Sequence, residues 1–320
     1  MAWILACMLA VLVALWVDRL WGEPPAWVHP VVVMGRYLGL MGPALTHLPA
    51  PLALLGGAMA WCLGACLVTA VGLAMELGWH WLVSTLAWPA WASAILAGLG
   101  LGLLLKPFLA WRMLRDEVHQ VEQALGQSLQ AGQTQLRRLV SRDVHQLDDV
   151  GVRESAIESL AENLNDSLVA PLFWFALLGL PGAALYRFAN TADAMWGHRG
   201  PYEWAGKWAA KLDDLLSWLP ARLTALLLCA AAGCWPGLAR MRAQARLTPS
   251  PNGGWPMGAM ALLLGVSLRK PGAYALNEQA GAPLARHTQA ALLMAGRAAW
   301  LAALVSALVQ AVPLVIGWGR

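Results

Sequence analysis

The sequence predicts an all-α fold, that of a polytopic helical integral membrane protein. Of 320 residues, 59% are hydrophobic and 12% are charged, and the mean hydropathy is +0.54, far from the averages of soluble domains. Apolar runs without a charged residue lie at 1 to 17, 52 to 75, 81 to 105 and 298 to 318. Each is near or above the roughly 20 residues that a helix needs to cross the hydrocarbon core. We therefore predict four spans within a single helical membrane domain, residues 1 to 320.

The first run resembles a signal peptide in length but not in its flanks. It has no basic segment before it, and it continues into Asp18 and Arg19 without a small-residue cleavage site. We expect it to be a retained anchor.

Two shorter apolar segments, 167 to 186 and 223 to 239, each contain a Pro-Gly pair. Such interruptions are typical of re-entrant or broken helices, in which protein or water satisfies the freed backbone groups. A plain tilted helix is the alternative for both segments.

The basic residues indicate an orientation. The polar region 106 to 166 holds seven of them: Lys106, Arg112, Arg115, Arg137, Arg138, Arg142 and Arg153. The positive-inside rule places this region in the cytoplasm and the short loop 76 to 80 outside. The stretch 187 to 222 also has five basic residues, so the same rule favours a cytoplasmic location for it. Both polar regions lie on the cytoplasmic side only if the segment 167 to 186 between them is re-entrant. Residues 108 to 147 are expected to form a helical hairpin, broken near 130 to 133, with Leu114, Val118, Val121 and Leu125 on one face.

The acidic residues are concentrated in this part of the chain. Eleven of the 18 fall between Asp143 and Asp214. Four of them, Glu154, Glu158, Glu162 and Asp166, recur every fourth residue, so one helix would carry a column of like charge that costs roughly 0.2 to 0.5 kcal/mol per adjacent pair. A solvated helix face is one interpretation. Because no Lys or Arg occurs from 154 to 186, a divalent cation or a cationic substrate is the interpretation we favour.

Carboxylate oxygens suit Mg²⁺, which is usually held by one or two carboxylates and by substrate phosphates. Asp193, Asp213 and Asp214 could add ligands, while Arg222 and Lys211 could hold phosphate or carboxylate oxygens. The aspartates could equally cap helices or face solvent. Known nucleotide signatures are missing, since Gly206-Lys207 is followed by Trp208 and forms no Walker loop. The net charge of +4 without a basic run interleaved with aromatic residues argues against nucleic acid as a partner.

Several long motifs then identify a relationship. "RDVHQLDDVGVRESAIESLAENLNDSLVAPLFWF", "NTADAMWGH", "KLDDLLSWLPARLTALLL", "SPNGGWP" and "DRLWGEPPAWVHPVVVMGR" resemble the cobalamin biosynthesis protein family CobD/CbiB over nearly the whole chain. Two positions depart from the common pattern, Glu23 in "GEP" and Val144 in "RDV", and the second leaves no hydroxyl there.

The resemblance implies adenosylcobinamide-phosphate synthase activity. In that reaction ATP and Mg²⁺ drive amide formation between adenosylcobyric acid and aminopropanol or its phosphate. It also implies a multi-pass protein of the bacterial inner membrane, in contact with lipid, whose active site faces the cytoplasm. A homo-oligomer, or a complex with other membrane enzymes of the pathway, is left open.

The implied chemistry gives the polar residues roles. A phosphoryl group is stabilised by Mg²⁺ and cations, and the protonated amine must lose a proton to a carboxylate whose pKa like neighbours raise. We expect catalytic residues among Glu158, Glu162, Arg142 and Arg222, metal ligands among Glu154, Asp166, Asp193, Asp213 and Asp214, and nucleotide contacts from Asn163, Asn190, Lys211, Ser250 and Asn252.

Two other functions are open. A membrane regulatory protein of the same superfamily would lack synthase activity, but the acid column and the SPN motif favour the enzyme. A proton-coupled transporter would need acids inside the spans, and the four predicted spans contain none.

Overall fold

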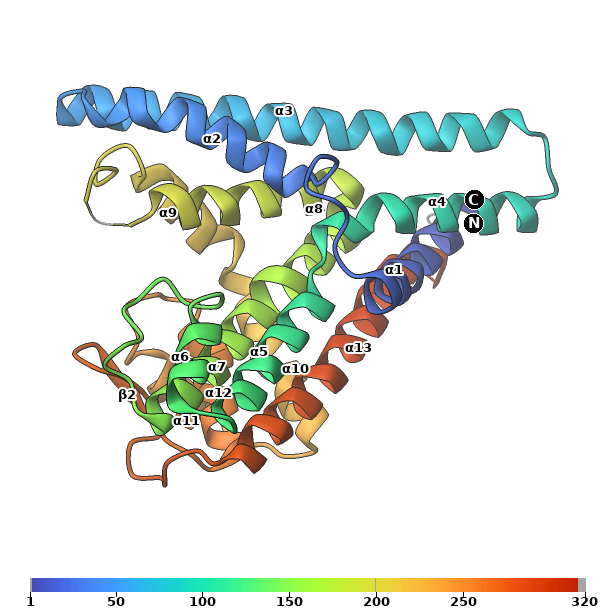
Figure 1. Ribbon diagram of the computed structural model, residues 1–320. Coiled ribbons are helices and arrows are strands. Elements are labelled where there is room, and N and C mark those ends of the chain that lie inside the picture. Colours follow the sequence, from blue (N-terminus) through green and yellow to red (C-terminus); the bar gives the residue numbers. More distant parts are fainter. Residues whose placement is uncertain (1, 199, 316–320) are drawn as a thin grey trace. The chain divides into compact units, whose positions relative to one another are not determined.

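The computed structural model describes residues 2–198 and 200–315. Its elements are α1 (Ala2–Trp21), α2 (Pro30–Thr46), α3 (Ala50–Thr85), α4 (Ala90–Leu105), η1 (Lys106–Phe108), α5 (Trp111–Leu125), α6 (Leu129–Leu136), α7 (Asp149–Leu164), η2 (Asn165–Val169), α8 (Ala170–Trp196), α9 (Lys207–Leu216), α10 (Trp218–Ala232), α11 (Leu238–Ala245), α12 (Gly254–Leu264), β1 (Leu268–Lys270), β2 (Tyr274–Leu276) and α13 (Ala285–Val315). The described part of the chain is therefore almost entirely helical, as predicted, with one small antiparallel hairpin of β1 and β2 (Figure 1).

The chain forms two compact units, which are described separately. Unit 1 comprises Met1–Ala110, Asp166–Leu216 and Ala303–Arg320, and unit 2 comprises Trp111–Asn165 and Ser217–Ala302. Neither unit is continuous in sequence, because the chain passes from one to the other four times.

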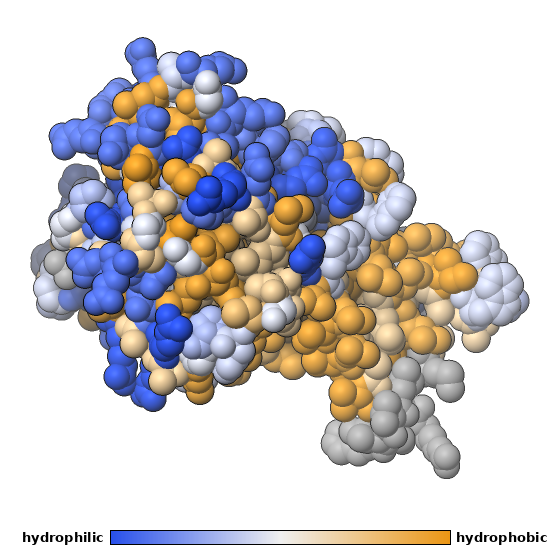
Figure 2. Space-filling model, turned by 90° about the horizontal axis from the view of Figure 1, so that it is seen from below, coloured by the Kyte–Doolittle hydropathy of each residue, from blue (hydrophilic) through white to orange (hydrophobic). Residues whose placement is uncertain are grey.

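Within the described residues, five helical segments are long and apolar enough to cross a membrane, or six if the bent pair α9 and α10 counts as one span. The prediction of a multi-pass membrane protein is confirmed at this level. Large apolar side chains also lie on the outside of these helices, as Figure 2 shows in orange, where lipid rather than water suits them. The last three residues of the span predicted at 298 to 318 lie outside the described residues.

The boundary between the second and third predicted spans was wrong. α3 continues through the predicted loop 76 to 80 to Thr85, and the break falls at residues 86 to 89, just before α4. At 1.5 Å per residue, the 36 residues of α3 extend for about 54 Å, well beyond the hydrocarbon core. Glu76 consequently lies inside a candidate span, so the expectation that the spans contain no acid does not hold.

In unit 1, α1 packs along α4, while α2, α8 and α9 pack against α3 (Figure 1). The approach of α1 to α4 depends on small residues, since a Cβ at Gly98 or Gly102 would lie 2.9 Å or 2.8 Å from the carbonyl oxygen of Ala6 or Ala10. Gly98 and Gly102 are thus helix-packing positions.

The N-terminal motif "DRLWGEPPAWVHPVVVMGR" forms a network of ion pairs with Lys106 within unit 1. The Lys106 ammonium lies 3.2 Å from the Asp18 carboxylate and 3.0 Å from that of Glu23, whose other oxygen accepts from His29 at 2.8 Å. Burial acts to raise the pKa of Glu23, but the hydrogen bond from His29 and the charge of Lys106 outweigh it and hold this pKa below its usual value. His29 also caps α2, because its Nδ1 accepts from the Val31 N–H.

The apolar segment 167 to 186 is broken, one of the two forms predicted for it. Gly179 adopts φ +70° and ψ −156° inside α8, two residues before Pro181. The freed N–H of Leu180 donates to the Glu76 carboxylate at 2.6 Å, and a Cβ at Gly179 would lie 2.4 Å from the same oxygen. Glu76 is therefore explained as the acceptor that satisfies a broken helix at membrane depth. The second Pro-Gly pair instead lies in the linker between α10 and α11.

We expect Glu76→Leu to destabilise the protein by about 1 to 3 kcal/mol, because the buried Leu180 N–H would lose its acceptor. Glu76→Gln keeps an acceptor and should lose much less. Thermal unfolding of both variants in detergent measures the difference, and equal stability of the two would show that Glu76 has no capping role.

In unit 2, α5 packs against α6 and α7, α10 and α11 pack against α12, and β1 lies against α7. The predicted apolar face of α5 is buried: Leu114, Val118, Val121 and Leu125. The hairpin breaks at residues 126 to 128, before the predicted 130 to 133, because Ser128 caps α6 by accepting from the Ala131 N–H at 3.1 Å.

Candidate functional site

The acidic helix α7 is buried in unit 2. Asp148 caps its N-terminus, since the Asp148 side chain accepts from the Gly151 N–H at 2.8 Å, and the helix packs against α5, α6, α12 and β1. Glu154 and Glu158 are only 5% and 4% exposed. The interpretation of these two residues as part of a solvated helix face is therefore wrong.

Their positive partners come from elsewhere in the chain. The Nη2 of Arg142 lies 3.2 Å from Oε2 of Glu158, and Lys270 also attracts this carboxylate. Arg269 attracts Glu154, whose Oε1 accepts from the Ser267 hydroxyl at 3.5 Å. Arg153, the only basic neighbour in the local sequence, instead pairs with Glu122 at 3.0 Å. The column is thus partly neutralised by loop and hairpin residues, which local sequence spacing did not reveal.

A small polar pocket of about 170 Å³ opens beside this helix. Three segments form it: residues 139 to 142, one face of α7, and the β1–β2 hairpin. Its lining side chains with polar groups are Ser141, Arg142, Ser155, Glu158, Ser159, Glu162, Asn163, Lys270 and Tyr274. Two cations and two carboxylates therefore share a space too small for a nucleotide or a corrinoid.

Two of these polar groups retain binding capacity. Nη1 of Arg142 and Oε1 of Glu158 are buried and have no hydrogen-bond partner among the described residues. Buried polar atoms are rarely left in this state, because the cost of removing them from water is then uncompensated. A guanidinium N–H from one segment and a carboxylate oxygen from another, in the same pocket, favour a ligand with both an anionic and a cationic group.

Tyr274 completes the wall opposite α7. Burial and then the charges of Glu158 and Glu162 raise the pKa of this phenol well above its usual value, so it remains protonated. Its hydroxyl interacts with Glu158 and donates to Met257 Sδ at 3.7 Å. Toward a carboxylate or an anionic ligand, the tyrosine can therefore act only as a hydrogen-bond donor.

The SPN motif supports this pocket from behind. A Cβ at Gly253 would lie 2.8 Å from a Glu162 carboxylate oxygen, so glycine allows the motif to approach α7. The Ser250 hydroxyl accepts from the backbone N–H groups of Asn252 and Gly253, and the Asn252 side chain accepts from Arg222 at 3.2 Å.

Arg222 has several partners. Its guanidinium lies over the rings of Trp218 and Trp255, 4.2 and 4.9 Å from their centroids, and donates to the Trp218 carbonyl. Neither Arg222 nor the SPN residues line the pocket, and their predicted contacts with substrate stay predictions.

Asp166 departs from the column. It belongs to η2, a π-helical turn that follows α7, whereas the three glutamates lie on the α-helix itself. In unit 1 it accepts from the Tyr186 hydroxyl at 3.3 Å, and its backbone carbonyl accepts from Arg187 at 3.1 Å. Tyr186, a side-chain partner of Asp166, thus belongs to unit 1, although the spacing of Asp166 in the sequence continues that of the glutamates.

Asp166 instead joins a second acidic group, formed in unit 1. Asp213 interacts electrostatically with Asp166, Asp193 and Asp214, and its side chain hydrogen-bonds to Asn190. Oδ1 of Asp213 is buried without a hydrogen-bond partner among the described residues, and Lys211 attracts Asp214. Of the predicted metal ligands, Asp166, Asp193 and Asp214 lie near enough to Asp213 to repel its charge, and Glu154 belongs to α7.

In the part of the chain that the structure describes, no three His, Cys, Asp or Glu side chains converge as a metal site. One or two carboxylates completed by phosphate oxygens remain the pattern expected for Mg²⁺.

Sequence reasoning missed Lys270 and Tyr274. They lie more than a hundred residues after α7 on a short hairpin. The one signal in the sequence was "LRKPGAYAL", a turn-forming Pro-Gly pair between short β-like segments.

The fold and the site together define a multi-pass helical membrane protein with a small, partly open pocket of mixed charge, of the kind that binds a polar small molecule. The chain belongs to the CobD/Cbib protein family, whose model matches residues 11–309.

Named relatives agree. The chain is 39% identical over 259 residues to "Probable cobalamin biosynthesis protein CobD" of Pyrococcus abyssi, covering 80% of this chain and 81% of that protein. It is 39% identical over 264 residues to "Cobalamin biosynthesis protein CobD" of Chromobacterium violaceum, covering 80% and 79%. For the protein of that name from Stutzerimonas stutzeri the identity is 37% over 313 residues, covering 94% and 98%. No solved structure matches. The chain thus has the family's role in cobalamin biosynthesis.

Proposed function

We propose that the protein catalyses ATP-dependent amide formation between the carboxylate of adenosylcobyric acid and the amine of aminopropanol phosphate. The observation that carries this proposal is the pocket of unit 2, of about 170 Å³. In it, one atom each of Arg142 and Glu158 lacks a hydrogen-bond partner among the described residues, and Lys270 lines the same space. Its size suits a short amino alcohol, and its mixed charge suits an ammonium at one end and a phosphate at the other.

The reaction requires activation of the acid. A carboxylate does not react directly with an amine, so the γ-phosphoryl group of ATP is first transferred to a carboxylate oxygen, which releases ADP. The amine nitrogen then attacks the acyl carbon, the C–O bond to phosphate breaks, and inorganic phosphate leaves. The ammonium must lose one proton before attack and one during it.

Glu158 is suited to this proton transfer. Its Oε1 has no hydrogen-bond partner among the described residues, while Arg142 donates to its Oε2 and Tyr274 interacts with the same carboxylate. A general base of this kind needs hydrogen-bond contact with the proton it removes. Arg142 Nη1 and Lys270 would bind the phosphate of the same substrate. Glu162, on the next turn of α7, is the alternative base.

The aspartate group of unit 1 fits a magnesium ion. Its donors are all carboxylate oxygens, and the buried Oδ1 of Asp213 lacks a partner among the described residues. Asp213 and Asp193 would hold the ion, with Asp166 and Asp214 as further charges. Bound Mg²⁺ supplies neutralising charge for a phosphoryl group.

Purified protein in detergent tests the function directly. With adenosylcobyric acid, aminopropanol phosphate, ATP and Mg²⁺, a corrinoid product with the mass of the amide should form, and omission of ATP should abolish it. A regulatory relative without synthase activity would form no product under any of these conditions.

The proposed orientation gives a separate prediction. In a background without the five native cysteines, Gln127→Cys and Glu203→Cys place thiols at exposed positions in regions expected to be cytoplasmic. Both should react in whole cells only with membrane-permeant reagents. Labelling of the thiol at 203 by an impermeant reagent would mean that the helical segment up to Trp196 crosses the membrane fully.

A further inference from the structure

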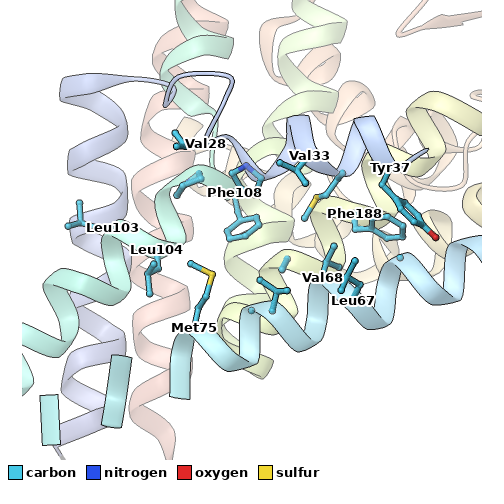
Figure 3. A pocket seen from close by; sticks show the side chains of 17 residues that line it. Val28, Val33, Tyr37, Leu67, Val68, Met75, Leu103, Leu104, Phe108 and Phe188 are labelled. Carbon is cyan, nitrogen blue, oxygen red and sulfur yellow. The ribbon is translucent and has the colours of Figure 1, made fainter. Parts of the chain in front are cut away.

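A second, entirely different cavity lies within unit 1. Its volume is about 390 Å³, and residues of α2, α3, α4, η1 and α8 line it (Figure 3). Figure 3 shows Phe108 and Phe188 directed into it, with Val68 and Met75 of α3 on another wall. This volume lies within the range of small-molecule sites.

The cavity offers almost no polar contact. Tyr37 supplies the only side-chain hydroxyl in its lining, and this hydroxyl donates to the Ala60 carbonyl at 2.8 Å. An apolar space of this kind does not retain water, because water needs two to four polar partners. The chemistry of the lining therefore selects a hydrocarbon group.

The cavity also opens sideways. Val33, Leu67 and Leu103 line it, yet each is more than half exposed, at 54%, 55% and 53%. Leu67 and Leu103 belong to helices long and apolar enough to cross a membrane. The opening thus faces the surface that lipid would cover, where acyl chains are the most abundant apolar molecules.

A cation accompanies this opening. Arg36 is exposed on α2, three residues after Val33 and one before Tyr37, so it shares a helix face with a residue of the opening. Its guanidinium matches the phosphate of a lipid headgroup. The site therefore complements a phospholipid. The cation would meet the anionic headgroup at the surface, and the apolar lining would surround an acyl chain inside.

We propose that this cavity binds one acyl chain of a membrane phospholipid, with Arg36 at the headgroup phosphate. The site is separate from the polar pocket of unit 2 and does not depend on the proposed reaction. It would hold a lipid as a structural component of unit 1.

Native mass spectrometry of protein incubated with phosphatidylglycerol and released from detergent tests the proposal. The unmodified protein should retain one lipid, and Val71→Trp, which places a large ring in the cavity lining, should reduce this population by about tenfold. Leu63→Trp is the matched control, because Leu63 is exposed on the same helix but does not line the cavity. Arg36→Gln should weaken retention and reduce any preference for phosphatidylglycerol over a neutral diacylglycerol.

Equal retention by the Val71→Trp and Leu63→Trp variants would overturn the proposal. So would a dimer in the unmodified protein that Val71→Trp alone dissociates, since the occupant would then be a second copy of the chain. If Val71→Trp fails to fold, as judged by circular dichroism, Leu67→Trp provides the same test from the next turn of α3.

Discussion

Replacement of Glu158 by glutamine should lower the rate of amidation by about 100-fold to 10,000-fold, the range by which a positioned general base accelerates proton transfer. The amide side chain keeps the shape of the carboxyl group but cannot take the proton of the amine. The binding of ATP should be little affected, because the pocket of unit 2 is too small for a nucleotide. Initial rates of product formation at saturating substrates measure the loss.

The same variant should be less stable. Like-charge repulsion along the column, taken alone, would predict a small gain in stability on removing one carboxylate. The structure reverses this expectation, because Glu158 is paired with Arg142, whose side chain is only 21% exposed. Glutamine can still accept a hydrogen bond from Arg142, so only the charge of the pair is lost, and the cost should stay below about 1.5 to 3 kcal/mol, the value of a whole charged hydrogen bond. Thermal unfolding in detergent should therefore shift downwards.

Glu117→Gln is the matched control. Glu117 is also ion-paired, at 2.7 Å from Arg138, and lies in the same unit without lining the pocket. It should keep the unmodified rate. If Glu158→Gln keeps that rate as well, Glu158 has no part in the chemistry and Glu162 becomes the candidate base.

Replacement of Lys270 by glutamine should weaken binding of aminopropanol phosphate by about 10-fold to 100-fold, the effect of losing one charged hydrogen bond. Binding of unphosphorylated aminopropanol should hardly change, since Lys270 is assigned to the phosphate. Titration calorimetry with the two amines separates these effects from catalysis.

Arg269→Gln provides the control on the same strand. Arg269 precedes Lys270 on β1, so its side chain points to the other face of the hairpin, and it interacts with Glu154 rather than the pocket. If Lys270→Gln and Arg269→Gln weaken the binding of aminopropanol phosphate equally, the loss reflects the net charge of the hairpin rather than a contact of Lys270. Equal loss of affinity for both amines would place Lys270 away from the phosphate.

The fold class could be predicted from the sequence because the hydrocarbon core of a membrane determines both the hydrophobic composition and the length of the apolar segments. The break in α8 was also within reach, since Pro181-Gly182 interrupts an apolar run. The end of α3 was not, because Glu76 and His80 suggested a loop, whereas the carboxylate of Glu76 is used by the backbone of a distant helix.

The site was only partly predictable. Glu158, Glu162, Arg142 and Asn163 were chosen from motifs, and all four line one pocket. Lys270 and Tyr274 could not be found by helical spacing, because tertiary packing brings the hairpin to α7. Asp166 followed the four-residue period in sequence, but it lies in the π-helical turn at residues 165 to 169 and contacts Tyr186 in unit 1.

The central claim, that this chain joins a phosphorylated amino alcohol to a corrinoid acid at the expense of ATP, is tested most directly by competition. Purified protein receives adenosylcobyric acid, Mg²⁺, ATP and equal concentrations of aminopropanol and aminopropanol phosphate, and mass spectrometry of the corrinoid product is combined with an assay of released inorganic phosphate. The account predicts the phosphorylated amide as the main product, with one inorganic phosphate released per amide formed. Predominance of the unphosphorylated amide would contradict the assignment of the pocket, and release of phosphate without any amide would contradict the proposed reaction.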